Sequence, residues 1–287
     1  MNRFVLFTDS GCDLTKALIA ECGAELVNLG VEIGGQAIDP GAVEDLKKFY
    51  DGMRQNKDTK TYAANTEQFL DAFEPYLAAG EDILYIAFSS GLSSTCGSAI
   101  LAANELSEKY PGRRVVVWDS KCASLGEGLM VYFAGEMKKE GAGIDEIVAA
   151  LEEKRPHLCH RFTVDDLVYL KRGGRISSAT ALLGSLLSIK PTLHITDEGK
   201  IVSIGKARGR KNAIRALFED MKELAVNPAE QTVFISHADC PEDAAALAEM
   251  IRTAFSPKRI EIGSIGPVIG SHSGPGTLAL FFLGSRR

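Results

Sequence analysis

The strongest constraint on this chain comes from residues 82–104, where a strand pattern runs through a hydroxyl-rich turn into a helix pattern. Residues 83–88 are continuously apolar, which is typical of a strand covered on both faces of a parallel sheet. Five Ser or Thr residues fall within 89–95, and small residues follow at helical spacing. Such a turn aims free N–H groups and hydroxyls at an anionic group. The pattern predicts a ligand loop at the carboxyl edge of an α/β sheet, with a serine that only caps the helix as the alternative.

Strand and helix patterns alternate through the first half of the chain. We expect strands at 3–8, 25–29, 83–88 and 114–118, and helices at 14–22, 67–79, 125–139 and 144–154. Alternation of this kind predicts a parallel sheet with helices on both faces, a Rossmann-like lobe. Gly34-Gly35 predicts a hairpin, and residues 43–55 a helix. Asp13 is the expected cap of the first helix, and Thr61 is expected in a loop.

The pattern changes near Pro156. Strands are expected at 157–164, 190–196, 200–207, 231–237, 259–265 and 277–283, with helices at 165–170, 177–189, 213–224 and 243–255. This order predicts a second α/β lobe with a mixed sheet. A chain of 287 residues is long enough for two domains of typical size. We expect them to be residues 1–158 and 159–287.

Composition excludes several classes of protein. The net charge of −6 argues against a nucleic-acid binder. No apolar run approaches the ~20 residues of a membrane span, and no signal region opens the chain. Six cysteines without a CxxC pair indicate reduced thiols, so we expect a cytoplasmic protein. Cys159 between His157 and His160 has no second ligand pair at a finger-like spacing, which favours a strand over a zinc site.

The familiar nucleotide and nucleophile motifs are missing. The chain has no GxxxxGK[ST] and no GxSxG, and the GxGxxA at 274–279 precedes a strand-like run rather than a helix. His272 follows a predicted strand and is expected in a glycine-rich loop, where the backbone can approach a ligand closely. If the two lobes face each other, Ser93 and His272 converge on one cleft. An acyl hydrolase that uses Ser93 and His272 remains open as an alternative.

Five segments carry a resemblance to a known family. They are TDSGCDL, SSGLSSTCGSA, WDSKCAS, LKRGGRIS and the closing GPVIGSHSGPG. In this order they resemble the DegV proteins, bacterial fatty-acid-binding proteins that include the carriers of the fatty acid kinase system. The resemblance covers essentially the whole chain. It implies two α/β lobes with an acyl tail buried between them and a carboxylate held near the surface by hydroxyls and a histidine.

The resemblance also implies roles for particular residues. By motif match, Thr61, Ser93 and His272 bind the carboxylate. The loops around them supply further candidates, namely Ser90, Ser94, Thr95 and Ser273. The chain departs from the family where Tyr-Ala-Ala-Asn follows Thr61, and at Ser94 and Cys96, where glycine and an aromatic residue are common.

Other expectations concern the tail and the partners. The predicted helix 177–189 is a candidate wall or lid for the tail, or an ordinary core helix, through its apolar residues Leu182, Leu183, Leu186 and Leu187. The basic islands 171–175 and 206–211 can dock an anionic membrane surface or an acidic partner, with Arg172 and Arg175 as candidates. We expect a fatty-acid carrier without catalytic machinery, metal or cofactor, which presents its ligand to a separate fatty acid kinase. A regulatory DegV protein without a kinase partner is the further alternative.

Overall fold

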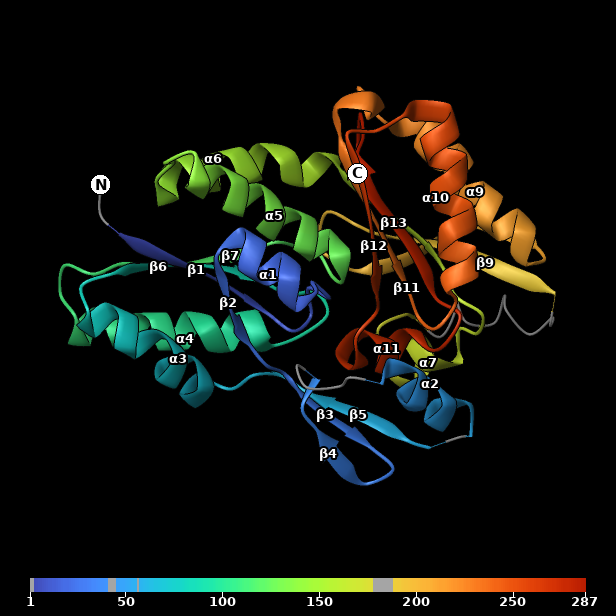
Figure 1. Cartoon of the computed structure of the whole chain (residues 1–287). Helices are drawn as coiled ribbons and strands as arrows, with labels where there is room; N and C mark the ends of the chain where they lie inside the picture. The colour runs from blue at the N-terminus through green and yellow to red at the C-terminus, as the bar shows by residue number, and fades with distance from the viewer. Residues whose placement is uncertain (1–2, 41–44, 56, 178–187) are drawn as a thin grey trace.

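The first lobe is built on a parallel sheet. A computed structural model describes residues 3–40, 45–55, 57–177 and 188–287. The sheet has the order β2-β1-β6-β7, formed by β1 (Phe4–Asp9), β2 (Ala24–Val27), β6 (Asp82–Ala87) and β7 (Val115–Asp119). One face carries α3 (Thr66–Ala78) and α4 (Thr95–Lys109), and the other carries α1 (Lys16–Cys22), α5 (Leu125–Lys139) and α6 (Ile144–Lys154) (Figure 1). The predicted Rossmann-like lobe is confirmed.

The burial of the central strand β6 on both faces explains its apolar composition. All six of its residues are buried. Ile83 and Tyr85 pack with α3 and α4, whereas Leu84 and Ile86 belong to the core on the side of α5. A strand covered on both faces has no polar alternation, which is why its sequence is a continuous apolar run.

A small antiparallel sheet extends the first lobe. It has the order β4-β3-β5 and consists of β3 (Gly30–Ile33), β4 (Gln36–Ile38) and β5 (Thr59–Tyr62), with α2 (Leu46–Arg54) beside it. Gly34 and Gly35 form the predicted hairpin turn with φ of +57° and +79°, a backbone region that other residues rarely adopt. Thr61 was expected in a loop, but it lies in β5 and pairs with Val31. The half-exposed sequence TKTY has too little apolar character to be recognised as a strand.

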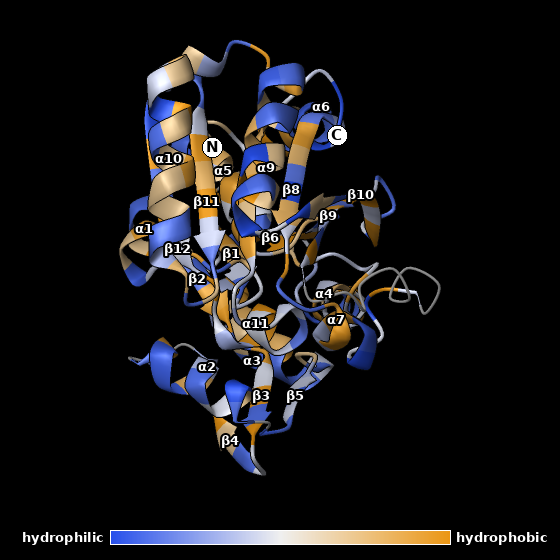
Figure 2. Ribbon diagram, turned by 90° about the vertical axis from the view of Figure 1, so that its right-hand side faces the viewer, coloured by the Kyte–Doolittle hydropathy of each residue, from blue (hydrophilic) through white to orange (hydrophobic). Residues whose placement is uncertain are grey.

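The second lobe is built on a mixed sheet of six strands. Its order is β10-β9-β8-β13-β11-β12, and only β11 and β12 pair in parallel. The strands are β8 (Leu158–Thr163), β9 (Ile189–Ile195), β10 (Ile201–Arg208), β11 (Thr232–His237), β12 (Arg259–Ser264) and β13 (Leu278–Leu283). Helices α9 (Arg210–Leu224) and α10 (Pro241–Phe255) pack on one face, and Figure 2 draws β11 largely in hydrophobic colours behind them. Because β8 is the first strand of this sheet along the chain and begins at Leu158, we propose that the lobes divide at its start, about residues 158/159.

Helix α5 lies between the two sheets and joins their cores. It contacts β1 and β6 on one side and β8, β11 and β13 on the other. Glycines allow the close approach: a Cβ on Gly126 would lie 2.2 Å from His160 Nε2, and one on Gly135 would lie 2.7 Å from Cys22 Cα. The lobes therefore share one continuous hydrophobic core rather than meeting at a wet interface.

The cap of α1 and the short helices α11 and α7 differ from what the sequence predicts. Thr15, not Asp13, caps α1 through its side chain, while Asp13 accepts a hydrogen bond from Gly266 N of the second lobe at 2.8 Å. The closing glycine-rich stretch was expected to be a loop, but residues Pro267–Ser273 form helix α11, with proline at its first position. The helix expected at 165–170 appears as α7 (Val168–Arg172). Two 3₁₀ turns, η2 (Arg155–His157) and η4 (Pro228–Glu230), complete the secondary structure of the described residues.

The predicted wall or lid helix at 177–189 falls mostly outside the described residues. Leu182, Leu183, Leu186 and Leu187 of the predicted wall or lid helix lie outside the described residues. Ile189, the last residue of that expected helix, begins strand β9. In the part of the chain that is described, no helix combines the length and the apolar character needed to cross a membrane.

Candidate functional site

An apolar cavity of about 490 Å³ lies where the two lobes meet. Its volume is within the range of roughly 300–1,000 Å³ that is usual for small-molecule sites. Both lobes contribute to a wall that is mostly hydrocarbon, with the described apolar residues Leu29, Ala63, Phe88, Leu92, Ala123, Phe162, Leu170, Ile195, Ile201, Ile265, Val268, Ile269, Ala279 and Phe281. The cavity is therefore suited to an elongated apolar molecule.

The three residues predicted to bind the carboxylate all lie on this cavity. Thr61 on β5, Ser93 in the loop before α4, and His272 on α11 all line it. Thr61 Oγ1 lies 2.6 Å from His272 Nε2, a direct hydrogen bond between the two lobes. Tyr62 and Ser94 line the same cavity and are exposed to solvent, so the cavity opens beside Thr61 and Ser93. One end of an apolar cavity thus carries neutral hydrogen-bonding groups.

The loop before α4 orients Ser93. Its Oγ lies 2.9 Å from Thr95 Oγ1 and accepts a hydrogen bond from Thr95 N at 3.2 Å. Ser94 occupies the N-cap position but makes no capping hydrogen bond through its side chain. Ser93 Oγ therefore satisfies the N–H of the first residue of α4, as a capping serine does, and Thr95 supports it from a fully buried position outside the cavity wall.

His272 is a neutral imidazole. Burial, and secondarily the nearby charge of Arg175, lowers the pKa of His272 to about 4. Its Nδ1 is buried and has no hydrogen-bond partner among the described residues. Gly173 lies directly against the ring, because a Cβ at that position would be 2.2 Å from Nδ1. The ring is thus held by packing on one side and by Thr61 on the other.

Arg175 lies on the cavity wall rather than on an open basic surface. Its Nε donates to the carbonyl of Leu92 at 3.1 Å, and its Nη1 donates to the carbonyl of Gly173. Burial lowers the pKa of Arg175, although an arginine remains a cation at neutral pH. Both of these hydrogen bonds are to neutral carbonyls, so the guanidinium supplies positive potential beside His272. Arg172, by contrast, has a side chain that is 57% exposed and 3.9 Å from Asp58.

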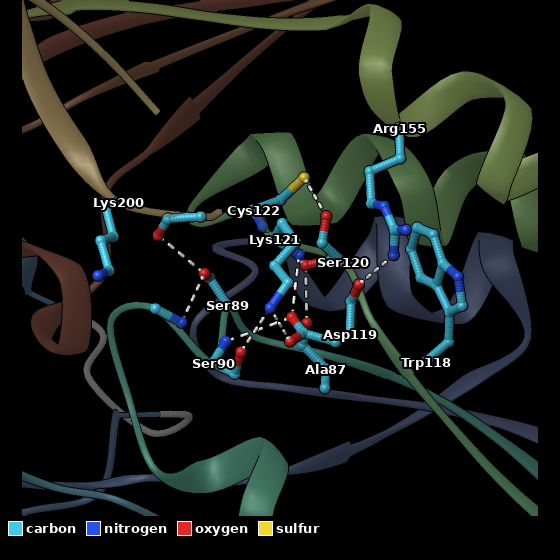
Figure 3. Close-up of polar contacts among 12 residues, drawn as sticks. Ala87, Ser89, Ser90, Trp118, Asp119, Ser120, Lys121, Cys122, Arg155 and Lys200 are labelled. Atoms are coloured by element: carbon cyan, nitrogen blue, oxygen red, sulfur yellow. Dashed lines mark hydrogen bonds and ion pairs between the residues drawn. The ribbon is translucent and has the colours of Figure 1, made fainter. Parts of the chain in front are cut away.

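The other candidate residues divide into two groups. Ser94 and Ser273 line the cavity, and Ser273 Oγ is buried without a hydrogen-bond partner among the described residues. Ser90, in contrast, is not among the residues that line the cavity: its Oγ accepts from Lys121 Nζ at 2.7 Å, and its N–H donates to Asp119 at 3.2 Å (Figure 3). A supporting role of Ser90 at the ligand stays a prediction.

The geometry of a hydrolase is not present among the described residues. His272 Nε2 bonds to Thr61, and Ser93 Oγ bonds to Thr95, so no hydrogen bond joins the candidate nucleophile to the candidate base. An imidazole whose pKa is lowered to about 4 is also a weak general base. The arrangement can hold an acid group by hydrogen bonds but has no activated nucleophile.

Sequence reasoning missed two cavity residues of chemical interest. Arg175 was expected to face a partner, and His160 was regarded only as part of a strand; both line the cavity. The signal for His160 is the alternation along β8. It shares a strand face with Phe162, which also lines the cavity, so its side chain had to point the same way.

The fold and the cavity define a class: a two-lobed α/β protein, built on a parallel and a mixed sheet, with an apolar cavity between the lobes that is polar at its open end. Residues 3–285 match the family described as "Uncharacterised protein, DegV family". The chain belongs to the DegV family.

Related proteins and structures agree with this assignment. The chain is 47% identical over 289 residues to a DegV domain-containing protein of Clostridium perfringens, covering 100% of this chain and 99% of the relative. A fatty-acid-binding DegV family protein from Thermus thermophilus superposes with a TM-score of 0.89 at 33% identity, covering 97% of this chain and 98% of that structure. DegV of Bacillus subtilis, a fatty acid binding protein, gives 0.87 at 29% identity, covering 98% and 99%.

Proposed function

We propose that this chain binds a long-chain fatty acid in the cavity between its lobes, without chemically changing it. The observation that carries the proposal is one hydrocarbon-lined cavity whose open end is lined by Thr61, Ser93 and His272. Two structural neighbours, from Thermus thermophilus and Bacillus subtilis, are fatty-acid-binding DegV proteins, which supports the same ligand class.

The tail supplies most of the binding free energy. A chain of roughly sixteen carbons, at about 0.8 kcal/mol per buried CH₂, contributes about 12 kcal/mol gross. The loss of translational and rotational freedom removes a large part of this. Partners for the carboxylate mainly avoid the desolvation penalty of a buried anion without hydrogen bonds.

The head-group site works by proton donation from neutral groups. Since Nδ1 of His272 has no partner, placing the ring proton on Nε2 satisfies it with Thr61 Oγ1 as the acceptor. The hydroxyl proton of Thr61 is then free to point at the ligand, and Ser93 donates from another loop of the same lobe. Arg175 adds a positive potential, because its two hydrogen bonds go to neutral backbone carbonyls and leave its charge uncompensated there.

Presentation to a kinase extends the proposal. The resemblance of the motifs to the carriers of the fatty acid kinase system suggests that a separate kinase phosphorylates the bound acid. The exposed Arg172 is a candidate contact for that partner, or for an anionic membrane surface during loading. The test is whether acyl phosphate forms from ATP only when the kinase and this protein are mixed. A DegV protein that binds lipid without a kinase would give binding but no acyl phosphate.

Organic extraction of the purified protein, followed by lipid mass spectrometry, tests the ligand. We expect one equivalent of a long-chain fatty acid, released intact, and no turnover of acyl esters. Protein that carries no fatty acid and fails to bind one when delipidated would contradict the proposed function. Hydrolysis of acyl esters that is lost in Ser93→Ala would instead support the hydrolase.

Gly173→Ala is expected to weaken fatty-acid binding by roughly tenfold although Gly173 itself is no proton donor to the ligand. Its backbone φ of −72° suits alanine, but the new Cβ would lie 2.2 Å from His272 Nδ1 and displace the ring from Thr61. Isothermal titration with a delipidated protein measures the loss. Gly97→Ala is the matched control, since a Cβ there meets no atom within 4 Å and affinity should not change.

A further inference from the structure

The guanidinium of Arg287 is buried at the junction of the two lobes. The residue is 8% exposed. Its Nε donates to the carbonyl of Ile195 at 3.0 Å and its Nη1 to the carbonyl of Arg155 at 3.4 Å, while its Nη2 donates to the carbonyl of Lys121. All three acceptors are neutral, although the burial of a cation costs free energy. The planar fork of donors lets one side chain join three carbonyls, so Arg287 ties separate parts of the chain together.

The three carbonyls belong to both lobes. Ile195 ends strand β9 of the second lobe, whereas Lys121 follows β7 and Arg155 follows α6 in the first lobe. Lys121 opens the loop 121–124, whose second half lines the cavity, and Ile195 lines the cavity from the other lobe. Arg287 is not among the described residues of the cavity wall. It therefore holds two parts of that wall together from behind.

A second hydrogen bond closes the same junction. Ser89 Oγ donates to the carbonyl of Gly199, in the turn between β9 and β10, at 2.9 Å, and Ser89 N donates to the carbonyl of Cys122 at 2.9 Å (Figure 3). The turn is seated without room for a side chain, because a Cβ on Gly199 would lie 2.1 Å from Ser89 Oγ. The hairpin β9–β10 is thus fixed to the first lobe at two points, Ile195 and Gly199.

Ile195 belongs to one row of residues across the mixed sheet. Phe162 on β8 pairs with Leu193 on β9, so two residues further along these antiparallel strands Ile195 lies level with His160. His160 in turn pairs with Phe281 on β13. Burial, and secondarily the charge of Arg287, lowers the pKa of His160, which agrees with a guanidinium close to this row. We call Ile195, His160 and Phe281 the distal row; all three line the cavity.

The distal row is separated from the head-group site along the strands. Thr163 on β8 pairs with Leu278, and Thr277, the residue before Leu278, donates through Oγ1 to the carbonyl of Ser273 on α11. His160 is three residues from Thr163, or about 10 Å at the usual rise of a strand. An extended long-chain acid whose carboxylate lies at the head-group site would therefore reach the distal row only with the distal half of its tail.

We propose that Arg287 is a positioning residue for the distal part of the cavity, and that by tying β9 to the loop 121–124 it determines how tightly long acyl chains are held relative to short ones. The inference rests on the proposed fatty-acid binding and adds a residue, outside the cavity wall, on which chain-length selectivity depends. Without the guanidinium, three buried carbonyls lose their donor and the two wall segments can separate. Carbons of the tail that lie between these segments would then lose their contacts with the wall.

The test is a series of affinities for straight-chain saturated acids from octanoic to stearic acid, measured with delipidated protein. Arg287→Met removes the donors and keeps a long, unbranched side chain. Its affinity for stearic acid should fall roughly tenfold, because each buried CH₂ contributes roughly a factor of four and about two of them lose their wall. Octanoic acid is too short to use the distal row, so its affinity should stay within about twofold. Arg287→Lys keeps a cation with three donors and should recover part of the loss.

Two further variants make the result specific. Arg286→Met is the matched control: it is the same change one residue earlier, in a side chain that is 73% exposed and 3.7 Å from Glu223, and it should leave every affinity unchanged. Ser89→Ala cuts the second tie of the hairpin and should weaken stearic acid about threefold without affecting octanoic acid. This variant decides the matter where Arg287→Met does not fold.

The outcomes separate the inference from the proposed function. If Arg287→Met binds all the acids like the wild type, or weakens octanoic and stearic acid by the same factor, the role assigned to Arg287 is overturned and fatty-acid binding stands. The same two outcomes in Ser89→Ala have the same meaning. If the wild type binds none of these acids, the proposed function itself fails.

Discussion

Replacing Thr61 by valine and Ser93 by alanine together is expected to lower the affinity for a long-chain fatty acid by roughly thirtyfold or more. Valine keeps the shape of threonine, so the change removes two hydroxyl donors and leaves the apolar wall intact. Each lost donor leaves a buried carboxylate underbonded, at about 1–3 kcal/mol, and two such losses combine to the stated factor. Displacement of a fluorescent fatty acid from the delipidated protein measures the effect.

Two controls make this result specific. Ser90→Ala is the same chemical change in the same loop, but its hydroxyl faces Lys121 rather than the cavity, so affinity should stay within about twofold (Figure 3). A fatty alcohol has no anion to satisfy, and its affinity should fall much less in the double variant. If the double variant binds fatty acid as tightly as the wild type, the carboxylate is not at Thr61 and Ser93.

The pH dependence expected of the head-group site follows from His272. Its pKa is lowered to about 4, so the ring is already neutral above about pH 5 and does not titrate between pH 6 and 8. As the pH falls, His272 is protonated in the unfolded chain near its ordinary pKa of 6.5, before it is protonated in the folded protein. The unfolded state thus binds the extra proton between these values, and the contribution of His272 to stability is lost as the pH falls from 6.5 toward 4.

The sheets of this protein were predictable because their strands obey simple patterns. The buried run at 83–88 could only be a strand covered on both sides, and Gly34-Gly35 could only be a tight turn. Strand β5 was not predicted, because its residues TKTY are half exposed and mostly polar. Helix α11 was not predicted, because its glycines and serines have low helix propensity. Its structure depends instead on its packing against α2, α7 and β5.

The site was predictable only as far as the motifs reach. Thr61, Ser93 and His272 came from segments with a resemblance to a family, and the structure brings all three to one cavity. Arg175 was assigned to a docking surface because a basic turn looks exposed in sequence. Its contact with the carbonyl of Leu92, 83 residues away, is a tertiary interaction that no local pattern encodes. The same limit applied to Asp13, whose partners are also distant in sequence.

Glu127 is the clearest case of a group whose role only the fold reveals. It lies on α5, between the two sheets, and is fully buried. Its Oε1 accepts a hydrogen bond from Thr8 Oγ1 at 2.9 Å, while Oε2 has no partner among the described residues. Burial, and then the nearby charge of Asp9, raises the pKa of Glu127 well above its ordinary value. Burial therefore favours the protonated form of this carboxyl group inside the shared core.

Glu127→Gln is expected to stabilise the protein progressively as the pH rises. In the wild type the folded state keeps the proton that the unfolded state releases near 4.5, so this group makes the free energy of unfolding fall as the pH rises above 4.5. Glutamine keeps the acceptor for Thr8 and has no proton to lose. The variant should therefore gain stability relative to the wild type as the pH rises from 5 to 7. Urea unfolding of the delipidated proteins at several pH values measures the difference. Glu105→Gln, on the exposed side of α4, should show no such slope. A constant difference between Glu127→Gln and the wild type across this range would mean that Glu127 is ionised in the fold and that its burial is relieved by water or a partner.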